Sequence, residues 1–150
     1  MKHWMKLAVA MIAAAVTSIA ATYAFAHRKM ARGTTVRVAK SRLGRILVDG
    51  KGITLYDFVA DKHGRSSCYG ACEAYWPPLL TKAKPHAGTG VRASLLGTTK
   101  RKDGKLEVTY NHHPLYYFIG DRKPGQATGQ GLNQFGAPWW ALSPAGREIH

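Results

Sequence analysis

The chain of 150 residues carries 22 lysines and arginines against 8 acidic residues, which gives a formal net charge of +14. This length favours one domain and leaves little room for a second. A field of this sign attracts anions such as nucleic acid, anionic lipid or acidic polysaccharide, and it disfavours strongly basic partners.

The first 26 residues have the layout of a secretory signal peptide. Lys2 and Lys6 form a positive start, residues 7–26 carry no charge, and this stretch ends in the small-x-small site Ala24-Phe25-Ala26. We therefore predict cleavage after Ala26 and export to the periplasm or the extracellular space. The alternative is an uncleaved anchor, because twenty apolar residues can span a bilayer. Contact with a membrane is expected only in that case.

Residues 27–43 contain many positive charges and no aromatic residue, so we predict a basic, flexible arm. Positive charge beside an apolar segment tends to stay in the cytoplasm, and the arm therefore opposes the prediction of export. In an exported protein the accessible partners are an anionic envelope component or another envelope protein. Nucleic acid is not expected as a partner for the same reason.

The rest of the chain contains one pattern twice, at an offset of 60 residues. Residues 55–61 (LYDFVAD) reappear as residues 115–121 (LYYFIGD), and the shared motif positions are Tyr56, Phe58, Asp61, Tyr116, Phe118 and Asp121. Alternating aromatic residues are typical of strands. We therefore predict a mostly β fold of residues 44–146. Two repeated β-hairpin units, residues about 44–80 and 104–146, pack as one small domain, with residues 147–150 as a tail.

Two short polar segments are predicted to be hairpin turns, residues 50–52 (GKG) and 111–114 (NHHP). Neighbouring residues of a strand point to opposite faces of a sheet. Tyr117 and one of the adjacent pair Trp139 and Trp140 are therefore expected to be surface aromatics, unless both faces of the sheet are covered.

Cys68 and Cys72 are the only cysteines. In an exported chain a lone close pair is most simply a disulfide, and here it would staple a short helical turn that ends before Pro77 and Pro78. The C-x₃-C spacing does not match the C-x-x-C of thioredoxin-like sites. A redox-active thiol pair and a zinc site stay open as alternatives, although zinc would need about two further ligands.

Taken together, these motifs resemble the bacterial "secreted repeat of unknown function" family, predicted lipoproteins with a Y-x-(F/W/Y)-x-x-D motif. The resemblance covers residues 44–146 and rests on the two motif copies, on Ser67-Cys68-x-Gly70-x-Cys72 and on residues 76–79 (WPPL). It implies an exported envelope protein with tandem copies of one unit. It implies no activity and no catalytic residues, and this chain has no cysteine near Ala26 to lipidate.

The residues favour a non-catalytic binding or structural module, with no catalytic residue and no cofactor. Asp61 and Asp121 could face one another as a hydrolase pair, but each is expected to cap its own turn by accepting backbone N–H bonds. The alternative function is a periplasmic redox or copper-handling protein with His63, His112 and His113 as ligands, because imidazole suits copper.

Overall fold

The computed structural model describes residues 33–150. The predicted signal peptide and residues 27–32 of the predicted arm lie outside the described residues. No helix in the described part is long and apolar enough to cross a membrane.

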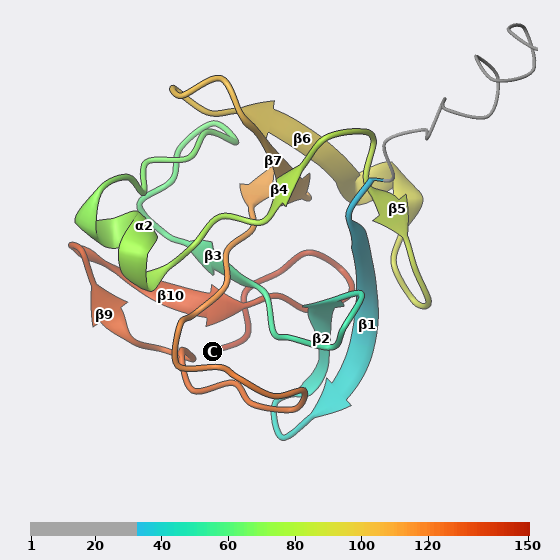
Figure 1. Ribbon diagram of the computed structural model, residues 1–150. Coiled ribbons are helices and arrows are strands. Elements are labelled where there is room, and N and C mark those ends of the chain that lie inside the picture. The colour runs from blue at the N-terminus through green and yellow to red at the C-terminus, as the bar shows by residue number, and fades with distance from the viewer. Residues whose placement is uncertain (1–32) are drawn as a thin grey trace, which may run out of the picture. The chain divides into compact units, whose positions relative to one another are not determined.

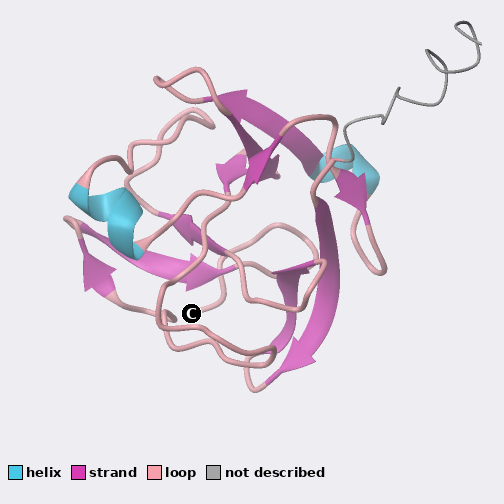
Figure 2. Cartoon of the chain, in the orientation of Figure 1, coloured by secondary structure: helices cyan, strands magenta, loops and turns pink. Residues whose placement is uncertain are grey.

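The fold is mostly β, as predicted, with short strands joined by long loops (Figure 2). The elements in chain order are β1 Thr35–Ser41, β2 Gly44–Asp49, β3 Tyr56–Phe58, α2 Ala71–Tyr75, β4 Leu80–Thr81, β5 His86–Ala87, the 3₁₀ turn η1 Ala93–Leu95, β6 Leu96–Lys100, β7 Leu106–Tyr110, β8 His113–Pro114, β9 Asn133–Gln134 and β10 Ala137–Ala141.

Two related halves exchange strands in this fold. Each half starts with an antiparallel hairpin, β1–β2 in the first and β6–β7 in the second. A later strand of each half pairs with the other half: β4 lies against β7 and β10 lies against β3 (Figure 1). The sheet orders are β2-β1-β5, β3-β10-β9 and β4-β7-β6, with β8 on β7. The prediction of two repeat units in one domain is confirmed, and the halves are interlocked rather than merely adjacent.

Both predicted hairpin turns are present. After β2 the chain turns so that the Asp49 N–H donates to the Ile53 carbonyl over 2.9 Å. Between β7 and β8, Asn111 and His112 have φ of 48° and 66°, and Tyr110 pairs with His113. Positive φ at both central residues defines the type I′ turn, whose twist matches that of the flanking strands.

The predicted arm and tail are wrong within the described residues. Thr35–Ser41 is strand β1, paired with β2 at six positions, and its Val36 is fully buried. The high charge around this segment concealed a period-2 pattern in which Val36 and Val38 point inward on either side of Arg37. At the other end, the Ile149 N–H donates to the Ala141 carbonyl over 3.0 Å and its side chain packs against the core. The folded domain therefore extends over residues 33–150.

Stacked aromatic rings form the centre of the core. Trp76 and Trp139, one from each half, stack with ring centroids 4.0 Å apart. Phe58 stacks on Trp139 at 4.0 Å and Phe118 packs on Trp76 at 4.5 Å, so each motif phenylalanine contacts the tryptophan of the other half. Such pairs contribute about 0.5–1.5 kcal/mol each beyond the burial of their area. The motif phenylalanines are therefore core residues.

Candidate functional site

The motif tyrosines and aspartates join the two halves in a reciprocal arrangement, which we call the clasp: Tyr56 with Asp121, and Tyr116 with Asp61. The Tyr56 hydroxyl donates to Asp121 Oδ2 over 2.6 Å and the Tyr116 hydroxyl to Asp61 Oδ2 over 2.7 Å. The backbones of Tyr56 and Tyr116 also exchange two N–H···O bonds of 2.9 Å each. These contacts are reciprocal between the two halves, so the repeated motif holds one half to the other.

Each clasp aspartate also caps its own turn, as expected. Asp61 Oδ1 accepts from the backbone N–H and the hydroxyl of Ser67, and Asp121 Oδ1 accepts from the same two groups of Thr128. Both oxygens of each carboxylate thus accept hydrogen bonds.

The predicted disulfide is present. Cys68 and Cys72 are bonded, their Cα atoms are 5.2 Å apart, and Cys72 lies in the short helix α2. In this oxidised state neither sulfur is free to bind zinc.

A buried guanidinium beside the disulfide was not foreseen. Arg101, in the loop between β6 and β7, donates to Glu107 Oε2 and Glu73 Oε2, both over 2.8 Å, and to the Cys68 carbonyl over 3.0 Å. Its guanidinium also lies 4.4 Å from the centre of the Tyr69 ring. Burial raises the pKa of Glu107 to about 8 despite the attraction of Arg101. Nothing local in the sequence distinguishes Arg101 from its surface neighbours, because its partners come from distant segments.

The acidic residues are almost all turned inward or paired. Four are buried, namely Asp49, Asp57, Glu107 and Asp121. The other four are held by ion pairs or hydrogen bonds: Asp61 by Ser67 and Tyr116, Glu73 by Arg101, Asp103 by Lys105 at 3.3 Å, and Glu148 by His150 at 3.2 Å. Most lysines and arginines of residues 33–150 are exposed. The outer surface is therefore cationic with few free acids.

The predicted surface aromatics are less exposed than expected. Trp139 is fully buried, whereas Trp140 and Tyr117 are half-buried. Trp140 packs edge-on against His150, and the Tyr117 hydroxyl donates to Asp49 Oδ2 over 3.0 Å. Alternation alone missed this, because the loops before β9 and after β10 cover the second face of the strand.

Other side chains form the exposed apolar patch, which consists of Tyr75, Ile119 and Phe135. Tyr75 is 50% exposed and Phe135 is 44% exposed, with their ring centroids 5.9 Å apart. Ile119 lies beside Tyr75, because its N–H donates to the Tyr75 carbonyl over 3.1 Å. Phe135 has a φ of 59° in the two-residue turn between β9 and β10. Asparagine or glycine normally occupies such a position.

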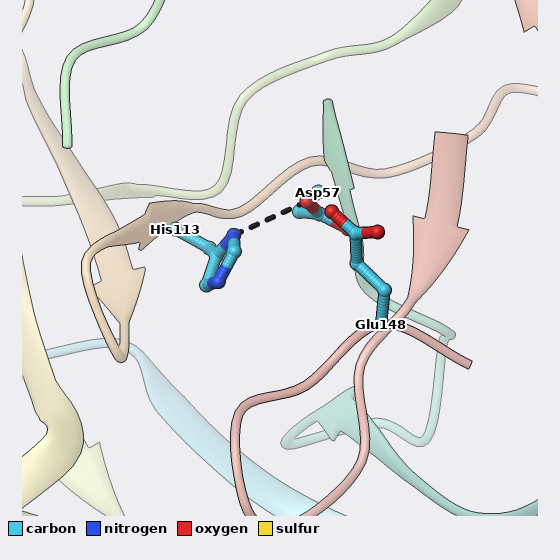
Figure 3. A group of neighbouring side chains, drawn as sticks. All are labelled: Asp57, His113 and Glu148. Atoms are coloured by element: carbon cyan, nitrogen blue, oxygen red, sulfur yellow. Dashed lines mark hydrogen bonds and ion pairs between the residues drawn. The ribbon is translucent and has the colours of Figure 1, made fainter. Parts of the chain in front are cut away.

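The three histidines considered as metal ligands do not converge on one ion. His63 and His112 are exposed turn residues with positive φ. His113 instead lies beside Asp57 and Glu148, and its Nδ1 is 3.1 Å from Asp57 Oδ2 (Figure 3). The hydrogen bond with Asp57 raises the pKa of His113. These three residues are 35 to 91 positions apart in the sequence, and no local motif marks them.

Comparison with known families agrees with the internal repeat. A family model described as "secreted repeat of unknown function" matches the chain twice, over residues 37–80 and again over residues 97–143. The two matched segments begin within β1 and β6, the first strands of the two halves. No curated protein and no solved structure matches the chain.

Proposed function

The chain belongs to the secreted repeats of unknown function, and on that premise we propose that this exported protein is a non-catalytic module that binds an acidic polysaccharide of the bacterial envelope. The proposed compartment is the periplasm or the extracellular space, after cleavage behind Ala26. N-terminal sequencing of the exported protein tests the cleavage position.

The observation that carries the proposal is the separation of charges described above. All eight acids are buried or paired, while the exposed charge of residues 33–150 is nearly all positive. Such a surface attracts a polyanion over about a Debye length, roughly 8 Å at physiological salt. Outside the cytoplasm the abundant polyanions are acidic polysaccharides and anionic lipids.

The exposed apolar patch favours the polysaccharide over the lipid. The rings of Tyr75 and Phe135 are tilted by 46° to one another, an arrangement suited to two successive sugar rings. Phe135 also holds a left-handed backbone conformation, which costs a residue with a Cβ about 1–2 kcal/mol. A bulky exposed side chain kept at such a position supports a role in binding rather than in folding.

The hydrogen bonds of the motif aspartates support a non-catalytic role. Asp61 and Asp121 are the acids that the repeat places at equivalent positions, and each is fully used by the clasp and its own turn. The copper-handling alternative is not carried forward, because His63 and His112 do not group with His113.

The test is calorimetric titration of the purified protein with polygalacturonate, neutral dextran and vesicles of phosphatidylglycerol. We expect polygalacturonate to bind, with an affinity that falls as salt rises, and dextran not to bind. Phe135→Asn should weaken binding about tenfold, equivalent to about 1.4 kcal/mol of stacking, while stabilising the turn. Leu80→Ala, which truncates an exposed leucine of β4, is the matched control and should bind normally.

Two results would overturn the proposal. Binding that is unchanged in Phe135→Asn and Tyr75→Ala would mean that the patch takes no part. Tighter binding to the vesicles than to polygalacturonate would identify anionic lipid as the partner instead.

A further inference from the structure

We infer that Asp57, His113 and Glu148 form a binding site for a divalent first-row transition-metal ion. This site goes beyond the proposed polysaccharide binding and uses none of the residues of the exposed apolar patch. Either function can therefore fail while the other stands.

The fold brings the three side chains together from separate elements. Asp57 lies in the middle of β3, His113 starts β8 just after the type I′ turn, and Glu148 lies in the segment that folds back on β10 through a bridge with Leu142. One ligand atom of each residue lies within 4.8 Å of the other two. Figure 3 shows the imidazole and the two carboxylates facing a common space.

The spacing of the first two ligands suits a shared ion. Bonds of about 2.0–2.2 Å from a metal to nitrogen and oxygen place neighbouring ligand atoms about 2.9–3.5 Å apart. His113 Nδ1 and Asp57 Oδ2 are 3.1 Å apart. An ion lying beside the line between these two atoms could thus bind both of them in place of their hydrogen bond.

A second observation favours a cation at this place. The Asp57 side chain is only 2% exposed, and its Oδ1 has no hydrogen-bond partner. A buried carboxylate oxygen without a partner is costly and rare in folded proteins. The nearby carboxylate of Glu148 adds a second acidic group to the same place. A divalent cation would satisfy the free oxygen and offset both charges.

The repeat provides an internal comparison. At the 60-residue offset, Asp57 corresponds to Tyr117 and His113 corresponds to Ile53. The Tyr117 hydroxyl donates to Asp49 Oδ2 over 3.0 Å, so the position equivalent to Asp57 holds a tyrosine that is hydrogen-bonded to a carboxylate. The ligand group is therefore a feature that breaks the symmetry of the two halves. Among residues 33–150 it is also the one group of three such side chains that converges.

The ligand set decides the class of ion. One imidazole and two carboxylates suit Zn²⁺, Mn²⁺, Fe²⁺ or Co²⁺, whereas Cu⁺ prefers sulfur ligands, and both cysteines are in the disulfide. The His113 and Glu148 side chains are 33% and 26% exposed, so an ion can enter from solvent. Three protein ligands leave coordination positions open for water or a further ligand.

The test uses the full chain stripped with a chelator and then titrated with Co²⁺, followed by visible absorption, and with Zn²⁺, followed by calorimetry. We expect one ion per chain and visible bands typical of Co²⁺ with nitrogen and oxygen ligands. His113→Gln and Glu148→Gln should each weaken Zn²⁺ binding at least tenfold. His112→Gln, which changes the adjacent exposed histidine, and His63→Gln should leave binding unchanged.

The outcomes that would overturn the inference are the absence of saturable binding, or an equal loss of affinity in His112→Gln and His113→Gln. Thermal unfolding of each variant without metal shows whether it is folded. Zn²⁺ should raise the melting temperature of the wild-type protein and of His112→Gln but not that of His113→Gln. A rise of the same size in His113→Gln would also refute the site.

Discussion

Removal of one hydroxyl from the clasp should weaken the whole domain, because the clasp joins its two halves. In Tyr56→Phe, Asp121 Oδ2 loses a donor at 2.6 Å and the Gly129 N–H loses its acceptor at 3.2 Å. A hydrogen bond to a carboxylate contributes about 1.5–3 kcal/mol, and an orphaned buried donor costs about 1–3 kcal/mol. Burial and the nearby Asp121 carboxylate raise the pKa of Tyr56, so its hydroxyl stays a donor. We expect a loss of about 2–4 kcal/mol.

The equivalent change in the other half should be milder. Tyr116→Phe removes the donor to Asp61, but Asp61 is half-exposed and keeps its Ser67 donors, and Ser66 keeps its bond to Arg101. Because water can reach Asp61, we expect a loss of about 1–2 kcal/mol.

Urea unfolding followed by tryptophan fluorescence, with the disulfide intact, measures both losses. Tyr75→Phe is the control, since Tyr75 is half-exposed, and its loss should stay below about 0.5 kcal/mol. If Tyr56→Phe and Tyr116→Phe both lost no more than this control, the clasp would not be what holds the halves together. An order opposite to the expected one would refute the argument from burial.

Three further predictions concern the network beside the disulfide. Above about pH 8, where Glu107 is ionised, Arg101→Met leaves this buried carboxylate without its cation and should cost about 3–5 kcal/mol in urea unfolding; a loss close to that of Lys105→Met, an exposed control, would contradict this. Burial raises the pKa of Glu107 to about 8, above the roughly 4.3 of an unfolded chain. Between these values the native state holds a proton that the unfolded state has released, so the free energy of unfolding should fall as pH rises from about 5 to 8. Glu107→Gln should flatten that slope, and an equally steep slope in the variant would assign it to another group. Reduction of the Cys68–Cys72 bond, which closes a five-residue loop, should cost about 2 kcal/mol by the loop-entropy relation; an unchanged urea midpoint after reduction would show that Arg101 and Glu73 hold the loop without it.

The local features of this protein could be predicted because they depend on residues close together in the chain. The type I′ turn at Asn111 and His112 follows from a short polar segment between two strand-like runs. The disulfide follows from two cysteines four positions apart. The repeat was visible because the motif residues recur at a constant offset. The prediction of a flexible arm was wrong because it rested on the charge of the segment and not on the alternation of its residues. Thr35–Ser41 is a strand with one fully buried valine.

What only the tertiary structure decided is the pairing across the halves. The sequence by itself determined that Tyr56, Asp61, Tyr116 and Asp121 are equivalent in pairs, but not that each tyrosine reaches the aspartate of the other half. The group of Asp57, His113 and Glu148 likewise exists only because β3, β8 and the final segment meet. Contacts between distant residues depend on which strands of the two halves pair with one another. That pairing depends on the packing of the whole core around Trp76 and Trp139.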